Sequence, residues 1–265
     1  MSSLVQARAL YRVQLRRSLA YRGQAALFVL TALFPLVLMA AWLALVAETG
    51  PVRGFTSSGI TSYFVAATLV NHFTRNWLVW DWEQELRTGG VAAKMLMPAH
   101  PLLHFLADHL ARMTVTGAVL VPVTLVVAAG LDGVVMVSDP LRLASALLAV
   151  AIGFGLSFVT AAIFASLAFW TTRVGQVYGL WWGCAAFLSG WLAPVSLLPS
   201  WLGDIAAVLP FQYMVGFPVE VLIGVRTGAA VLGGLVTGAA WLAVAFVGLA
   251  VSWSFGTRRF EAFGG

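Results

Sequence analysis

Residues 81–112 read DWEQELRTGGVAAKMLMPAHPLLHFLADHLAR, and no other stretch between the first and the last apolar run is so polar for so long. This segment holds seven of the chain's 15 basic and 10 acidic residues and three of its four histidines. Long apolar runs flank it on both sides. We therefore interpret residues 81–112 as the water-facing segment of a membrane protein, around which the other parts of the chain are arranged.

The composition of the whole chain agrees with this interpretation. Of its 265 residues, 61% are hydrophobic and 9% are charged, and the mean hydropathy is +0.93. A soluble domain has about 25% charged residues, so this chain cannot cover a water-exposed surface. The net charge of +5 does not indicate nucleic-acid binding, because the basic residues cluster at the ends of apolar runs. The single cysteine, Cys184, lies within an apolar run and cannot form an internal disulfide.

Six runs are free or nearly free of charge: Ala25–Ala47, Gly59–Trp80, Met113–Leu131, Leu143–Thr172, Val174–Leu198 and Ala229–Thr257. A helix needs about 20 apolar residues to span a bilayer, and a charge at its centre costs about 2.5–3.5 kcal/mol. The sequence thus predicts an all-α integral membrane protein with six transmembrane helices in a single domain, residues 1–265.

The distribution of positive charge predicts the topology. Six crossings place both ends on one side, and a cytoplasmic N-terminus puts 12 basic residues inside and three outside, a strong positive-inside bias. The outside set is Arg53, Arg142 and Arg226. The inside set is Arg8, Arg12, Arg16, Arg17, Arg22, Arg75, Arg87, Lys94, Arg112, Arg173, Arg258 and Arg259. Residues 81–112 are then cytoplasmic, and residues 1–24 form either a cytoplasmic helix at the membrane surface or an ordinary positive flank.

Residues 199–228 are too short and too interrupted for a seventh span. The apolar part, Ile205–Val219, has only 15 residues and contains Pro210 and Pro218. We expect a re-entrant helical hairpin on the outer face between the fifth and sixth spans, with Pro194, Pro199 and Pro210 at its bends. Arg75, the one formal charge in the second run, either extends to the interface or lines a translocation path.

Two patterns of small residues predict contacts between helices. Gly175, Gly179 and Gly183 form GxxxGxxxG at the start of the fifth run, and Gly234 and Gly238 form GxxxG in the sixth. Glycine at this spacing lets two helices approach closely. The pattern does not decide whether the contact lies within one chain or between chains.

The residues required for most enzymatic chemistry are missing from the sequence. The single lysine, Lys94, is not part of the phosphate-binding motif GxxxxGK[ST], so this chain does not hydrolyse ATP by itself. No cysteine and histidine pattern has zinc-ligand spacing, and the pair His104 and Asp108 lacks a second carboxylate on its helix face. We therefore predict no catalytic, cofactor or metal site.

Several short motifs resemble one family of membrane proteins. They are SGWLAPVSLLPSWLGDIAAVLPF, with Ser189, Gly190, Pro194, Pro199 and Pro210; FPVEVLIG, with Pro218 and Gly224; and KMLMPAHPLLHFLADHL. With the six runs and the polar segment, they resemble the permease subunits of type-2 ABC exporters over nearly the whole chain. The branch is the bacterial one usually encoded as paired permeases beside one ATPase. Met97 stands before Pro98 where that family is expected to have an arginine.

This resemblance implies partners and sites. Two permease chains, identical or paralogous, form a twelve-span core in the bacterial inner membrane, and separate nucleotide-binding subunits hold ATP and Mg²⁺. A coupling helix lies within Trp82–Met97, and its ATPase-facing candidates are Asp81, Glu83, Glu85 and Arg87. Candidates for a path for an amphiphilic substrate are Asn71, His72, Asn76, Trp181 and Trp182. The alternative function is an integral membrane enzyme, or an accessory protein, that acts on lipids.

Overall fold

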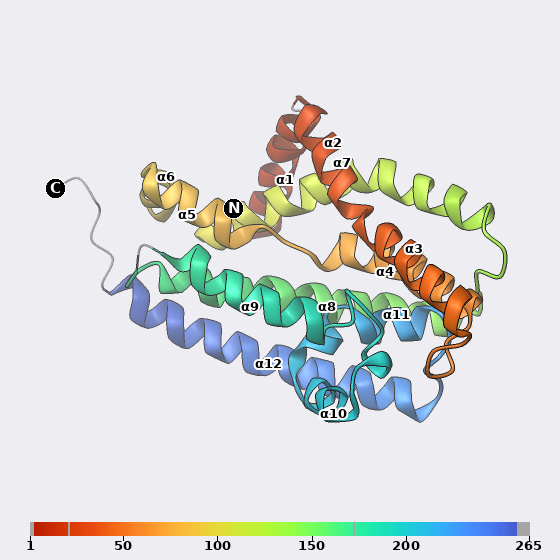
Figure 1. Ribbon diagram of the computed structural model, residues 1–265. Helices are drawn as coiled ribbons and strands as arrows, with labels where there is room; N and C mark the ends of the chain where they lie inside the picture. The colour runs from red at the N-terminus through yellow and green to blue at the C-terminus, as the bar shows by residue number, and fades with distance from the viewer. Residues whose placement is uncertain (1–2, 21, 172, 259–265) are drawn as a thin grey trace.

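The computed structural model describes residues 3–20, 22–171 and 173–258, which form helices joined by turns (Figure 1). Thr172, the last residue of the fourth predicted run, lies outside this part of the chain, as does Arg259 of the predicted inside set. Residues 1, 2 and 21 of the predicted N-terminal helix also lie outside it. The α-helices are α1 Ser3–Ala20, α2 Arg22–Ala32, α3 Phe34–Thr49, α4 Ser57–Thr74, α5 Leu78–Arg87, α6 Gly90–Met95, α7 Pro101–Ala129, α8 Pro140–Leu167, α9 Val174–Leu188, α10 Ser200–Val208, α11 Gly216–Leu222 and α12 Ala229–Thr257. Two short 3-10 helices, η1 Val195–Leu197 and η2 Pro210–Tyr213, flank α10. Within the described residues the protein is therefore all-helical, as predicted.

Four stretches in the described part of the chain are long and apolar enough to cross a membrane: Leu27–Thr49, Pro101–Ala129, Pro140–Leu167 and Ala229–Thr257. They correspond to the first, third, fourth and sixth predicted spans. The first is divided into α2 and α3 at Leu33. The break lies next to Pro35, which has no backbone N–H to donate to a helical hydrogen bond. The third starts earlier than the sequence predicts, because α7 includes the last twelve residues of the polar segment 81–112.

The second predicted span, Gly59–Trp80, is divided in the structure. Helix α4 ends at Thr74, residues 75–77 are not helical, and α5 starts at Leu78. Helix α4 is surrounded by protein, since 13 of its 18 residues are buried. Its sequence can therefore include Asn71 and His72, which a lipid-facing helix would expose at high cost.

The fifth predicted span, Val174–Leu198, is also interrupted. Helix α9 ends at Leu188, and the chain turns at Gly190, whose φ of +89° lies in the left-handed region that favours glycine. Prolines mark the following helix starts: Pro194 precedes η1, Pro199 precedes α10, and Pro210 begins η2. The predicted bends at these three prolines thus coincide with helix boundaries.

Helix α8 lies at the centre of the fold. It packs against α12, α11, α4 and α5, and Gly153 of α8 lets the backbone of Tyr213 and Met214 approach closely. One buried cluster surrounds α4, α8 and α11, and a second joins α5 and α7 to the other end of α8 and to α9. Gly234 and Gly238 of α12 face Phe217 of α11 and Ile152 of α8, so the predicted GxxxG contact is made within the chain.

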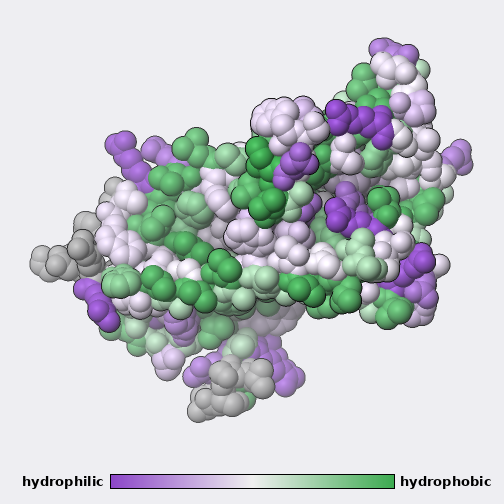
Figure 2. All heavy atoms as spheres, turned by 90° about the horizontal axis from the view of Figure 1, so that it is seen from below, coloured by the Kyte–Doolittle hydropathy of each residue, from purple (hydrophilic) through white to green (hydrophobic). Residues whose placement is uncertain are grey.

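The outer surface of α12 is strongly apolar. Its buried residues are Gly234, Gly238 and Gly256, whereas large side chains such as Leu232, Phe246 and Val247 are more than half exposed. The face of the molecule in Figure 2 is mostly hydrophobic or pale, with hydrophilic groups in scattered patches. A surface of this kind fits lipid rather than water.

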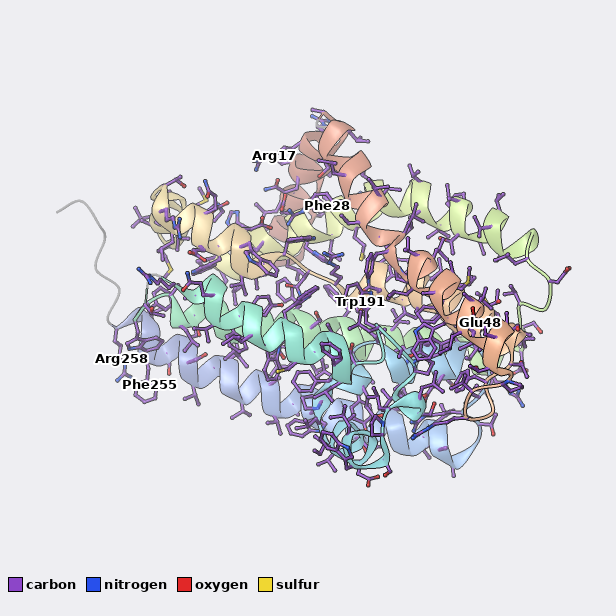
Figure 3. All side chains as sticks on the ribbon, in the orientation of Figure 1. Arg17, Phe28, Glu48, Trp191, Phe255 and Arg258 are labelled. Atoms are coloured by element: carbon purple, nitrogen blue, oxygen red, sulfur yellow. The ribbon has the colours of Figure 1, made fainter. Side chains whose placement is uncertain are left out.

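The ends of the helices gather at two opposite ends of the molecule. In Figure 1, α5, α6, the start of α9 and the end of α12 share one end. The turns 50–56, 130–139 and 223–228 share the other. Figure 3 shows the same division in side chains, with Arg258 and Glu48 at opposite ends and Trp191 between them.

Candidate functional site

The polar module, which we define as residues 78–97, consists of α5, a tight turn and α6. The turn passes through Gly89, whose φ is +76° and which therefore favours glycine. One face of α5 is apolar and buried through Leu78, Val79 and Trp82. The four residues that the sequence singles out as ATPase-facing flank this buried face, with Asp81 and Glu85 on one side and Glu83 and Arg87 on the other. Helix α5 is thus an amphipathic helix attached to the end of the membrane bundle.

The attachment depends on aromatic packing around Trp82. The indole ring of Trp82 is 1% exposed and lies 5.2 Å from the ring of Phe105 in α7, 5.6 Å from Trp253 in α12 and 6.2 Å from Phe169, measured between ring centroids. Its Nε1 is buried and has no hydrogen-bond acceptor in the part of the chain that the structure describes. One side chain therefore connects α5 to the ends of two long helices and to the turn after α8.

The acidic residues of α5 are all paired within the chain. Asp81 pairs with Arg112 of α7, which also binds Asp108 at 3.0 Å. Glu85 pairs with Lys94 of α6, and Glu83 pairs with Arg87. These pairs fix α6 to α5 and α5 to α7. A polar cavity of about 230 Å³ separates this network from α1, whose Gln14, Arg17 and Ser18 line its far side.

Glu83 also connects the polar module to α9. Its Oε2 accepts a hydrogen bond from the backbone N–H of Gly175 at 2.9 Å. Gly175 is the second residue of α9, so this carboxylate caps the positive end of the helix dipole. A Cβ at position 175 would collide with Glu83 Oε2. Gly175 is therefore small because a carboxylate must reach its backbone.

The other two glycines of the GxxxGxxxG pattern make no such contact. An added Cβ at Gly179 or Gly183 would have no atom of the described chain within 4 Å. Within the described residues, then, no helix packs on these positions. A close helix contact through Gly179 and Gly183 requires another molecule.

The free tip of the polar module is apolar. Leu96 is 89% exposed and Met97 is 48% exposed, directly after α6. Arg87 is the most exposed member of the four predicted coupling residues, with 68% of its side chain accessible. Leu96 was not singled out from sequence, and Met97 was noted only as the residue before Pro98 at the end of the predicted coupling segment. The signal of this tip is an apolar pair on a segment that is otherwise polar.

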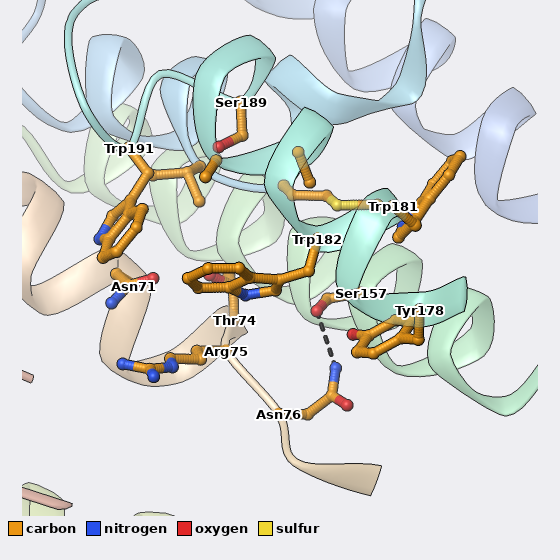
Figure 4. A pocket seen from close by; sticks show the side chains of 14 residues that line it. Asn71, Thr74, Arg75, Asn76, Ser157, Tyr178, Trp181, Trp182, Ser189 and Trp191 are labelled. Carbon is orange, nitrogen blue, oxygen red and sulfur yellow. Dashed lines mark hydrogen bonds between the residues drawn. The ribbon is translucent and has the colours of Figure 1, made fainter. Parts of the chain in front are cut away.

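A small cavity lies between α4, α8, α9 and the chain after α9 (Figure 4). Its volume is about 60 Å³, enough for a few waters at about 10–15 Å³ each. It is lined by Asn71, Thr74, Arg75, Asn76, Ser157, Tyr178, Trp181, Trp182, Ala185, Ala186, Ser189, Trp191, Met214 and Val215. The structure thus brings four of the five predicted path residues together on one cavity.

The fifth, His72, lines a neighbouring cavity of about 50 Å³ with Asn71, Arg75 and His109. A hydrogen bond links its Nε2 to the backbone oxygen of Met113 at 3.1 Å. Asn76 donates from Nδ2 to Ser157 Oγ at 2.8 Å, the contact drawn in Figure 4. His72 and Asn76 are therefore already engaged in bonds that join α4 and its C-terminal end to α7 and α8.

Sequence reasoning missed Trp191 and Tyr178 as lining residues. Trp191 follows the turn at Gly190. Tyr63 of α4 holds this turn in place, because its hydroxyl donates a buried hydrogen bond of 2.8 Å to the Gly190 carbonyl. No periodicity predicts that a residue after α9 returns to the side of α4.

In the described part of the chain, no group of three or more histidine, cysteine, aspartate or glutamate residues is placed to hold a metal ion.

Comparison with known proteins gives one family. The family model described as ABC-2 family transporter protein matches residues 32–264. No curated protein matches the chain.

Proposed function

The chain belongs to the ABC-2 family of transporter proteins, and from this premise we propose that it is the membrane-spanning permease subunit of an ATP-driven exporter for an amphiphilic substrate. As a member of that family with several helices able to cross a membrane, it is a multi-pass permease component of an ABC transporter. Export, the amphiphilic substrate, the bacterial inner membrane and the identity of the partner chains belong to the proposal.

The proposed topology has six crossings with both ends in the cytoplasm. They are Leu27–Thr49, α4, α7, α8, α9 and α12, in one transmembrane domain. Residues 199–228, with α10 and α11, would form a re-entrant hairpin from the outer face. Support comes from the alternation of chain direction between the two ends in Figure 1 and from the positive-inside bias. Burial of Gly216–Val221 also fits, because irregular backbone at membrane depth must be packed in protein.

The proposed coupling element is the polar module at the cytoplasmic end. Separate ATPase subunits would bind ATP and Mg²⁺ and contact this module, since the chain has no phosphate-binding motif of its own. Through the contacts of their carboxylates, Asp81 would transmit movement to α7, Glu83 to α9 and Glu85 to α6. Arg87, Leu96 and Met97 would form the surface that the ATPase touches, because their side chains are exposed.

The proposed mechanism is alternating access. Closure of the ATPase dimer on ATP would favour one position of the polar module, and ATP would thereby shift the equilibrium between two states of the permease. Trp82 and the Glu83 cap would pass this movement to α12 and α9, which border the bundle. A second permease chain would complete the core, and the uncovered Gly179 and Gly183 are candidates for that contact.

The observation that carries the proposal is the family match, and the test is on the tip of the polar module. The chain is co-expressed with its cognate ATPase subunit, and the complex is purified in mild detergent. Leu96→Asp is expected to release the ATPase, because a charge replaces an exposed apolar contact. Val135→Asp, an equally isolated change in the turn at the opposite end, is the control. Retention of the ATPase by Leu96→Asp would contradict the assigned surface.

A labelling experiment tests the orientation. A cysteine placed at Arg87 in a Cys184→Ser background is treated in intact cells with a membrane-impermeant maleimide. We expect labelling only after the cells are opened. Labelling from the outside would reject a cytoplasmic polar module and with it the ATPase contact. The alternative function, a membrane enzyme acting on lipids, requires lipid turnover by the isolated chain without any ATPase.

A further inference from the structure

We propose that Arg75 binds the anionic headgroup of an amphiphile, whose apolar tail lies in the groove formed by α2, α3 and Trp191. This proposal depends on the proposed permease function in one respect, since the bound amphiphile is taken to be the transported substrate. Its core is a binding site, and the site can be tested in the isolated chain.

Arg75 is the single residue shared by three cavities. It lines the small cavity between α4, α8 and α9, the neighbouring cavity with His72, and an open groove of about 940 Å³. The break between α4 and α5 produces this position, because residues 75–77 are not helical. Figure 4 shows Arg75 on the same side of the small cavity as Asn71 and Trp191. The guanidinium therefore lies where two small cavities, each with some polar lining residues, meet an apolar groove.

The guanidinium of Arg75 has no anionic partner among the described residues. Neither an ion pair nor a hydrogen-bond acceptor is found for it there, and it lies over the ring of Trp77, 4.7 Å from Cζ to the ring centroid. Other partly buried arginines of the described chain have carboxylate partners. Arg112 pairs with Asp81 and Asp108, and Arg226 pairs with Glu220. A cation within the protein without a counter-ion is costly, so an external anion is the natural partner.

Two more hydrogen-bond donors at this place lack acceptors. Among the described residues, Nδ2 of Asn71 and Nε1 of Trp191 are both buried without a hydrogen-bond partner, and Asn71 is only 6% exposed. Both residues line the small cavity together with Arg75. None of the residues lining the three cavities is an aspartate or a glutamate. A site that offers donors and no carboxylate is complementary to a group that only accepts hydrogen bonds, such as a carboxylate or phosphate.

The size of each cavity limits what can bind. The two small cavities, about 60 and 50 Å³, admit a small headgroup but not a sugar chain. The groove is lined by Leu30, Thr31, Leu33, Phe34, Leu36, Val37, Ala40, Arg75 and Trp191. Its volume lies within the range of about 300–1,000 Å³ typical of small-molecule sites, and its wall is almost wholly apolar. A small anionic head at Arg75 with a hydrocarbon tail along α2 and α3 satisfies both parts.

The test measures binding by the purified chain in an uncharged maltoside detergent, without an ATPase. The probe is a dansyl-labelled long-chain fatty acid, read by energy transfer from tryptophan, and its methyl ester is the matched neutral probe. We expect the acid to bind more tightly than the ester. Hydrogen bonds to charged groups correspond to changes of about 10- to 100-fold in the dissociation constant.

Variants assign the site. Arg75→Gln is expected to weaken binding of the acid about 10- to 100-fold and to leave the ester unchanged. Arg75→Lys, which keeps the charge, should retain most of the affinity. Arg142→Gln, at an exposed arginine remote from the groove, is the control. Trp191→Phe, which removes one donor and keeps an aromatic wall, provides a second reading if Arg75→Gln fails to fold, and should weaken binding of the acid by several-fold.

The source of the headgroup is distinguished by competition. A single-chain alkyl phosphate and phosphatidylglycerol should both displace the probe, whereas inorganic phosphate should not, because it lacks a tail. Displacement by inorganic phosphate at equal concentration would reject the amphiphile. Equal binding of acid and ester, or an unchanged Arg75→Gln variant, would reject the anion site. Loss of the ATPase contact with intact binding would reject the permease proposal alone.

Discussion

Replacing Gly175 by alanine is expected to destabilise the protein, although alanine is the better helix former. A Cβ at this position would collide with the Glu83 carboxylate that caps α9 through the Gly175 N–H. Gly179, one turn later in the same helix, has no atom within 4 Å of an added Cβ. The two substitutions therefore share one chemical change and differ in the presence of the cap.

The expected magnitude follows from opposing terms. Glycine to alanine within a helix gains about 0.5–1 kcal/mol. Loss of a side-chain cap costs about 0.5–2 kcal/mol, and loss of a favourable charge at the helix N-terminus costs a further 0.3–1 kcal/mol or so. We expect Gly175→Ala to lower the free energy of unfolding by about 1 kcal/mol. Gly179→Ala should raise it by up to about 1 kcal/mol.

The assay is a double-mutant cycle on the unfolding free energy in mixed detergent micelles, followed by circular dichroism. In a Glu83→Ala background the collision is absent, so Gly175→Ala should become stabilising. The two changes should then be non-additive by about 1–2 kcal/mol, as expected for groups in contact. If Gly175→Ala behaves like Gly179→Ala, or if the effects of Glu83→Ala and Gly175→Ala simply add, the cap does not stabilise α9.

Three further predictions use the same unfolding assay. Trp82→Ala should lower the free energy of unfolding by about 3–5 kcal/mol, because it leaves a cavity. Trp82→Phe should lower it by less than about 1.5 kcal/mol, because Nε1 has no hydrogen bond to lose among the described residues. Similar costs for both variants would contradict this. Arg226→Ala should cost about 2 kcal/mol and Glu220→Gln less, because the carboxylate is 10% exposed and the guanidinium 34%; the reverse order would be unexpected. Gly190→Ala should cost about 3 kcal/mol, because it combines a positive φ with crowding by Tyr63 and the Gly216 backbone, whereas Gly89→Ala should cost about 1 kcal/mol from φ alone.

The alternation of charge-free runs and polar segments was sufficient to predict an all-helical membrane protein. The family resemblance drawn from the motifs around Gly190 and Pro199 is confirmed by the match over residues 32–264. Four of the six predicted spans are long apolar helices. These features were accessible because transfer of a helix into lipid depends on the sum of its residues' hydrophobicity, which is a local property of the sequence.

The breaks within the second and fifth runs were not predicted. Each run is long and carries at most one formal charge, yet α4 ends at Thr74 and α9 at Leu188. Hydropathy does not register such breaks, because the freed backbone groups find partners elsewhere in the fold. One example is the Gly216 N–H, which donates to the Ser189 carbonyl at 2.7 Å.

The predicted site residues show the same division. Asp81, Glu83, Glu85 and Arg87 were singled out because the family resemblance implies a coupling helix in this polar segment. That the three acids pair with α6, α7 and α9, and leave Leu96 as the free tip, depends on helices far apart in the sequence. Composition thus determined that the chain enters the membrane. The tertiary structure alone decided where its few polar groups meet, because each of them must find a partner wherever the packing of the helices brings one within reach.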